Sequence, residues 1–231
     1  MLGPIDYVVW SVCMLAQTAV LVCAFRSRCL GQYFTLNFYM LAALLLSIGR
    51  VFVFVRYGYT SPQYFYFYYF SDALLTICLY FALMGLYLHV FQEMGVSSYL
   101  RTAAILLLGL TAWISYQMVV TSSHKMLTHF VVELSQNLYF VGVVLTYLLW
   151  GAIMKLRETR TRLIQLVLAL GVYFSAFAAS YALRNLYPEF VAWRYVAHLM
   201  QVWLPLAWAY TFIKIPEEAR LATDRVAATN R

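Results

Sequence analysis

The chain has 231 residues, of which 64% are apolar and 11% are charged, whereas an ordinary soluble domain carries about 25% charged residues. This composition excludes a soluble fold. Seven bilayer-spanning helices of about 22 residues would use about 154 positions, or two thirds of the chain. The net charge of +7 does not indicate nucleic-acid binding, because the basic residues are scattered near the ends of apolar segments and form no patch.

Seven apolar segments predict seven membrane-spanning helices. They cover residues 5–25, 33–55, 64–91, 102–120, 130–154, 163–183 and 195–213. Eleven basic residues flank the loops on one side and four flank the loops on the other, and the positive-inside rule places the richer side in the cytoplasm. We therefore expect an all-α integral membrane protein. It is a seven-helix bundle with the N-terminus outside and the C-terminus in the cytoplasm, in which a transmembrane domain of residues 1–214 precedes a short cytoplasmic tail of residues 215–231.

The third segment begins with seven consecutive aromatic residues, 64–70. Such a run is typical of the aromatic belt at a membrane interface, and here we place it at the outer one. The alternative is that these rings form the wall of a ligand pocket, and both roles can hold on different faces of one helix. The four cysteines, Cys13, Cys23, Cys29 and Cys78, lie in apolar segments or in a loop predicted to be cytoplasmic. We therefore predict no structural disulfide.

Small residues recur every four positions in the sixth segment, at Gly171, Ser175 and Ala179. A stripe of this kind lets helix backbones approach closely in a bilayer. The stripe predicts helix packing within the bundle, and the same stripe could also serve a homodimer contact. Pro205 lies well inside the seventh segment and predicts a kink there.

Three ionisable residues lie inside the predicted spans, whereas the other Asp, Glu, Lys and Arg residues lie at span ends or in loops. Arg50, Asp72 and Glu133 fall roughly 8, 12 and 5 Å below the outer boundary at the helical rise of 1.5 Å per residue. A charge at such a depth costs several kcal/mol unless it is paired or hydrated. Asp72 lies about 4 Å deeper than Arg50, so its removal is expected to be the more costly of the two.

Helical spacing extends these charges into polar stripes on four helices. We expect a polar chamber that opens outward and is plugged on the cytoplasmic side. Its candidate ligand-binding residues are Arg50, Tyr69, Asp72, Thr76, Glu133, Gln136, Asn137, His198, Gln201 and Trp208. The alternative is a structural ion pair between Arg50 and Asp72, with the other polar groups joining helices by hydrogen bonds. An ion or proton pathway is less favoured, because few polar groups continue into the inner half.

Catalytic, metal and cofactor sites find little support in the sequence. A zinc site built from His124, His129, Glu133 and His198 is conceivable, but this spacing is common by chance, so we predict no metal. Zinc hydrolases of the ceramidase and adiponectin-receptor type have paired histidines on the last span, where this chain has His198 alone. Retinal proteins need a lysine in the middle of the last helix, and none occurs there. We expect no cofactor and no enzymatic activity, with a membrane-embedded hydrolase as the alternative.

These patterns leave two main functional hypotheses. The first is a receptor-like or sensory module that binds a small molecule or lipid and signals through a cytoplasmic or membrane protein partner. The second is a non-catalytic structural or interaction subunit of a membrane complex. A transporter is less favoured, because the spans contain few prolines and polar breaks. The arrangement of seven spans resembles that of bacterial seven-helix input modules in architecture alone. On this basis we expect the protein to lie in a bacterial inner membrane.

Overall fold

The computed structural model describes residues 4–27, 29–92, 97–120, 126–156, 160–187 and 192–215, apart from the side chains of residues 4–6, 126, 127, 185, 192–195, 197 and 198. These residues form seven α-helices: α1 (Pro4–Arg26), α2 (Phe34–Tyr57), α3 (Pro62–Val90), α4 (Ser97–Val120), α5 (Met126–Lys155), α6 (Thr161–Leu186) and α7 (Ala192–Lys214). Each coincides with one predicted span to within five residues at either end. The predicted tail lies outside the described residues, except for Ile215.

Six of the seven helices, α1 to α6, are long and apolar enough to cross a membrane. The all-helical architecture fits a helical integral membrane protein, as the composition predicts. Among the described residues α7 is not one of these six, so the seventh span stays a prediction. The orientation of the termini in the membrane also stays a prediction.

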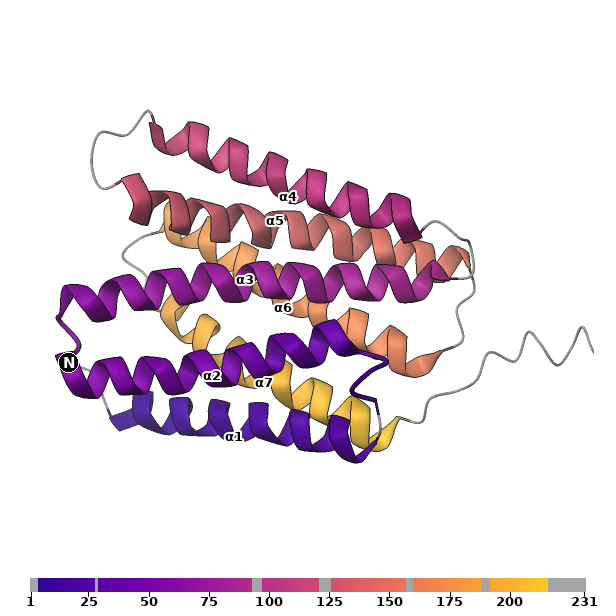
Figure 1. Cartoon of the computed structure of the whole chain (residues 1–231), viewed down its shortest axis with the longest axis horizontal. Helices are drawn as coiled ribbons and strands as arrows, with labels where there is room; N and C mark the ends of the chain where they lie inside the picture. Colours follow the sequence, from indigo (N-terminus) through magenta and orange to yellow (C-terminus); the bar gives the residue numbers. More distant parts are fainter. Residues whose placement is uncertain are drawn as a thin grey trace, which may run out of the picture.

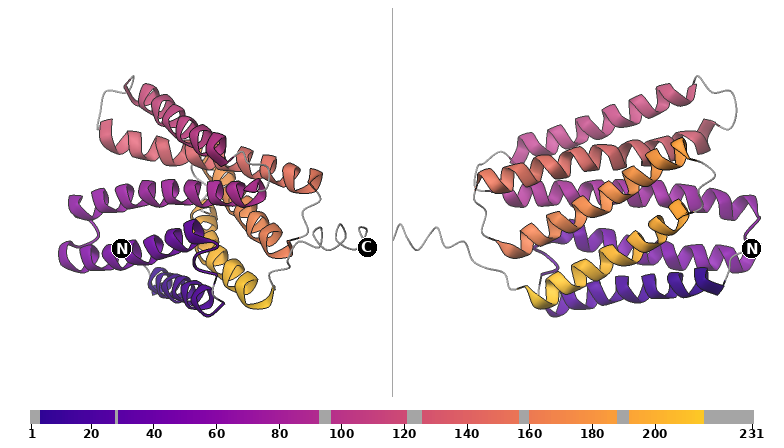
Figure 2. Two further views of the ribbon diagram at one scale, coloured as in Figure 1. Left: turned by 45° about the vertical axis from the view of Figure 1, so that its right-hand side comes forward. Right: turned by 180° about the vertical axis from the view of Figure 1, so that it is seen from behind.

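The helices run back and forth between two ends of the molecule (Figure 1). We name these ends by the loops they carry: the α2–α3 end, where the chain also begins, and the α1–α2 end, where α7 finishes. Adjacent contacts join α1, α2, α3, α5, α6 and α7 into a closed ring, because α7 packs back against α1. The remaining helix, α4, packs against α5 and over a shorter length against α3, so it lies outside the ring (Figure 2).

A tight turn joins α2 to α3 and positions two walls of the ring. Gly58 ends α2 with a φ of 81°, a conformation that residues with a Cβ rarely adopt. Ser61 caps α3 by accepting a hydrogen bond from the backbone N–H of Tyr64 at 3.1 Å, and Pro62 occupies the first turn, where a missing N–H costs nothing. The turn therefore holds the C-terminal half of α2 beside the aromatic start of α3.

One end of the small-residue stripe of α6 packs against a neighbouring helix inside the ring. A Cβ on Gly171 would lie 3.0 Å from Cγ2 of Thr146 on α5, so this glycine lets α5 and α6 approach closely. A Cβ on Gly142 of α5 would overlap the ring of Phe174 on α6. At the other end of the stripe Ala179 is exposed. Packing within the bundle thus accounts for Gly171, and a homodimer through the stripe stays a prediction.

A buried arginine closes the α1–α2 end. The sequence places Arg162 in a loop flank, but its side chain is only 6% exposed. It donates from Nε and Nη2 to the carbonyl oxygen of Ile215 at 2.9 and 2.7 Å, and from Nη1 to Sγ of Cys29 at 2.9 Å. All four cysteines are free thiols. Arg162 therefore fastens the start of α6 to the end of α7 and to the α1–α2 loop.

Candidate ligand cavity at the α2–α3 end

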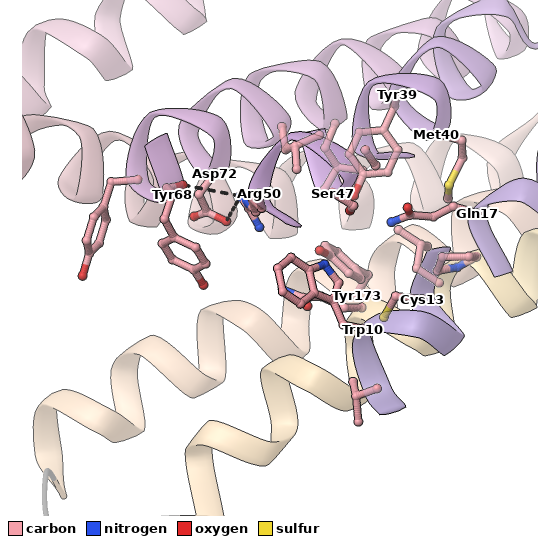
Figure 3. A pocket seen from close by; sticks show the side chains of 18 of the residues that line it. Trp10, Cys13, Gln17, Tyr39, Met40, Ser47, Arg50, Tyr68, Asp72 and Tyr173 are labelled. Atoms are coloured by element: carbon pink, nitrogen blue, oxygen red, sulfur yellow. Dashed lines mark hydrogen bonds and ion pairs between the residues drawn. The ribbon is translucent and has the colours of Figure 1, made fainter. Parts of the chain in front are cut away.

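A cavity of about 490 Å³ lies inside the ring toward the α2–α3 end (Figure 3). Its volume falls in the range of about 300 to 1,000 Å³ that is usual for small-molecule sites. Helices α1, α2, α3, α5, α6 and α7 all contribute to its wall, together with the α2–α3 turn. The lining residues are Val9, Trp10, Cys13, Gln17, Tyr39, Met40, Ala43, Ser47, Arg50, Tyr59, Tyr64, Phe65, Tyr68, Tyr69, Asp72, Leu75, Leu79, Tyr139, Tyr173, Gln201, Leu204 and Pro205.

The aromatic run at the start of α3 serves two faces of one helix. Tyr64, Phe65, Tyr68 and Tyr69 line the cavity, because positions three and four apart share a side of an α-helix. Tyr66, between them, is 50% exposed and points to the outside of the bundle, where an interfacial ring would sit. The structure therefore makes part of the run a pocket wall and leaves the rest available for an aromatic belt.

Arg50 of α2 and Asp72 of α3 form the charged part of the wall. Nη2 of Arg50 lies 4.0 Å from Oδ1 of Asp72, and the two side chains are 11% and 28% exposed. Arg50 also donates from Nε to Oγ of Ser71 at 2.8 Å and from Nη2 to the carbonyl oxygen of Tyr68 at 3.4 Å. Its guanidinium carbon stands 4.6 Å from the centroid of the Tyr68 ring. Arg50 is thus held by several groups, of which Asp72 is one.

The wall contributed by α1 was not predicted from the sequence. Trp10, Cys13 and Gln17 are three and four residues apart on one face of this helix, and all three line the cavity. Gln17 is 8% exposed, and its Oε1 has no hydrogen-bond partner among the described residues. Figure 3 shows its amide directed toward Tyr39 and Ser47 across the cavity. The signal that could have found this wall is Gln17 itself, the one amide side chain in the first apolar segment.

Four of the ten predicted ligand-binding residues line the cavity: Arg50, Tyr69, Asp72 and Gln201. Thr76 lies one turn beyond Asp72 and is 1% exposed. Its hydroxyl donates to the carbonyl oxygen of Asp72 at 2.9 Å, and it lies 3.4 Å from the hydroxyl of Tyr139. Thr76 therefore supports the cavity from behind and does not face it.

The polar stripe of α5 lies away from the cavity. Glu133, Gln136 and Asn137 are half-buried and do not line it; Asn137 donates from Nδ2 to Oγ of Ser115 on α4 at 2.9 Å. Tyr139 is the α5 residue in the wall, and six residues at 100° each place it about 120° around the helix from Glu133. Through Asn137 the stripe thus helps to join α5 to α4, the helix outside the ring, which is the role that the alternative interpretation gives to polar groups.

The remaining predicted site residues are Trp208 and the three histidines His124, His129 and His198. Trp208 is fully buried, with its ring edge-to-face against Tyr39 at 6.0 Å, so it packs behind the cavity wall. The side chain of His198 and all of His124 lie outside the described residues, and His129 is exposed. Within the described residues no three His, Cys, Asp or Glu side chains are grouped as metal ligands would be.

No known protein family, curated protein or solved structure matches this chain. The function is therefore inferred from the residues around the cavity and from their contacts.

Proposed function

We propose that this protein is a receptor-like membrane module that binds a small molecule or lipid in the cavity at the α2–α3 end. The observation that carries the proposal is the cavity of about 490 Å³, which is lined by nine aromatic residues among 22 and contains one ion pair. Large, apolar cavities with a few convergent polar groups are the usual form of a ligand site. We propose no catalytic step. The predicted positive-inside orientation would make the cavity accessible from outside the cell.

Aromatic contacts run from the cavity wall toward the opposite end of the bundle and support a signalling role. Tyr39 lines the cavity and touches Trp208, and one turn further along α7 the ring of Phe212 lies 5.9 Å from that of Tyr33. Tyr33 in turn stacks on His89 at 5.1 Å. A ligand that moves Tyr39 would therefore disturb packed rings that reach the α1–α2 end. A protein partner at that end would be needed to receive the signal.

Cys13 offers a native reporter of entry into the cavity. It lines the cavity yet is only 5% exposed, so a thiol reagent should reach it chiefly through the cavity. The experiment uses the Cys23→Ala, Cys29→Ser, Cys78→Ala protein in lipid nanodiscs and measures the rate at which methyl methanethiosulfonate modifies Cys13. We expect modification of the folded protein at a measurable rate.

Two substitutions that introduce the same phenyl ring at neighbouring positions of α2 provide the comparison. Ser47→Phe places a ring in the cavity, which Ser47 lines, and should slow the modification at least tenfold. Ile48→Phe adds the same kind of ring to a side chain that is 52% exposed on the outside of the bundle, and should leave the rate unchanged. A Cys13 thiol that stays unreactive in the folded protein, or equal rates in the two variants, would contradict an accessible cavity.

A further inference from the structure

We propose that the ligand of this cavity is an uncharged ring compound that carries a hydroxyl group, with the hydroxyl hydrogen-bonded to the amide of Gln17. The inference rests on the proposed function, because it names the class of molecule that the cavity would bind. Three features of the wall carry it: its charge balance, its aromatic content and the unpartnered amide.

The charge balance of the wall favours an uncharged ligand. Arg50 and Asp72 are the charged residues that line the cavity in the described part of the chain, and they neutralise each other across 4.0 Å. A charged ligand would have to leave water and either compete with this pair or remain without a counterion. Both cost more than the transfer of an uncharged molecule of similar size.

The aromatic content of the wall favours a ring. Nine of the 22 lining residues are aromatic, and they come from α1, α2, α3, α5, α6 and the α2–α3 turn. They therefore surround the cavity and do not form one flat face. Aromatic side chains prefer offset-stacked or edge-to-face contacts with another ring, and the lining rings are inclined to one another, as Tyr139 and Tyr173 show at 6.4 Å and 48°.

The amide of Gln17 favours a hydroxyl on that ring. Its Oε1 is buried and has no hydrogen-bond partner among the described residues, and more than nine tenths of the residue's surface is inaccessible to solvent. A buried carbonyl oxygen without a donor is costly, and a ligand hydroxyl would supply the donor. The same hydroxyl oxygen can accept from the amide N–H2, so the match does not depend on which way the amide is turned.

The test compares 1-naphthol with 1-methoxynaphthalene, which has the same rings but cannot donate a hydrogen bond. For each probe we measure the concentration that halves the rate of Cys13 modification, in nanodiscs, for the Cys13-only protein and for its Gln17→Met variant. Partitioning of each probe into lipid is the same for both proteins and cancels in this comparison. We expect the preference for 1-naphthol to fall by about threefold to tenfold in Gln17→Met, the range for loss of one neutral hydrogen bond.

Thr18 supplies the control. It is adjacent to Gln17 on α1 but is exposed and does not line the cavity, so Thr18→Met should keep the preference for 1-naphthol. Should Gln17→Met not fold, Gln17→Asn withdraws the amide by one methylene and should lose the preference as well. An equal preference with and without the Gln17 amide overturns this inference. Failure of both probes to protect Cys13 overturns it as well, whereas the proposed function fails separately, if the Ser47→Phe and Ile48→Phe variants react alike.

Discussion

In the described part of the chain, Arg50 and Asp72 differ in the polar contacts that they make besides their ion pair. This difference predicts which of the two substitutions destabilises the fold more. Without Asp72, Arg50 still donates to Oγ of Ser71 at 2.8 Å and to the carbonyl oxygen of Tyr68 at 3.4 Å. Without Arg50, the Asp72 carboxylate loses its one polar partner in the described part of the chain. We therefore expect Arg50→Gln to destabilise the fold more than Asp72→Asn. Depth in the bilayer alone predicted the reverse order.

The magnitude follows from the 4.0 Å separation of the pair. Coulomb's law gives about 1 kcal/mol at this distance in water and about 4 kcal/mol at the effective dielectric of a protein surface. The side chains of Arg50 and Asp72 are 11% and 28% exposed, so the interaction falls between these limits and is partly offset by desolvation. With the hydrogen bond to Ser71 included, we expect costs of about 3 kcal/mol for Arg50→Gln and about 1 kcal/mol for Asp72→Asn, with a coupling of about 1 kcal/mol.

The assay is a double-mutant cycle of equilibrium unfolding in mixed micelles, followed by tryptophan fluorescence. Arg56→Gln is the control, because Arg56 is exposed at the end of the same helix, and its free energy of unfolding should change by less than about 0.5 kcal/mol. The double variant should be about 1 kcal/mol more stable than the sum of the single changes predicts. A coupling of zero, or a larger loss for Asp72→Asn than for Arg50→Gln, would refute the reasoning.

Three further predictions concern topology and packing. Thr60→Cys and Gly31→Cys place exposed thiols at opposite ends of the bundle, and an impermeant maleimide added to intact cells should label only Thr60→Cys if the positive-inside orientation holds. Gly142→Ala should destabilise the protein by about 1 to 3 kcal/mol, since its Cβ would overlap a ring of α6, whereas Gly109→Ala, which meets nothing within 4 Å, should be neutral or stabilising. Arg162→Met should cost about 2 to 3 kcal/mol and speed tryptic cleavage at the end of α7, because it removes the donors to a carbonyl oxygen there.

Each of these predictions has an outcome that would contradict it. Labelling of Gly31→Cys alone would reverse the orientation and would place the cavity toward the cytoplasm. Equal unfolding free energies for Gly142→Ala and Gly109→Ala would mean that α5 and α6 do not approach as closely as the structure shows. Unchanged proteolysis in Arg162→Met would mean that α7 is fastened by other contacts.

The helices themselves could be predicted from the sequence, because bilayer thickness sets the length of an apolar segment. Their order around the ring could not. Residues 102–120 resemble the other spans in length and hydropathy, and only the packing shows that α4 lies outside the ring. The sequence has no charge or glycine pattern that distinguishes a ring helix from an outer one. For this reason the polar stripe of α5 was assigned to the chamber, whereas Asn137 joins α5 to α4.

The candidate site could be predicted in part. Arg50 and Asp72 stand out because charged residues are costly inside apolar segments, and the structure does place both on the cavity wall. Gln17 does not stand out by charge, so the α1 wall was missed. The position of Arg162 in the sequence predicts a basic residue that flanks a cytoplasmic loop, yet its side chain is buried. A basic residue at a helix start looks the same in sequence whether it reaches solvent or turns inward to a carbonyl oxygen.

The two ends of the bundle differ in a way that favours a receptor over a transporter. The α2–α3 end contains a cavity of about 490 Å³, whereas at the α1–α2 end Arg162 donates three hydrogen bonds to Ile215 and Cys29. Alternating access would require this second end to open in each cycle. Opening would separate the Arg162 guanidinium, which cannot lose its proton, from its hydrogen-bond partners. It would also expose side chains such as Tyr33 and Leu86, which are 2% and 0% exposed. A module that binds its ligand from one end, and transmits a smaller displacement through packed rings, keeps these contacts intact.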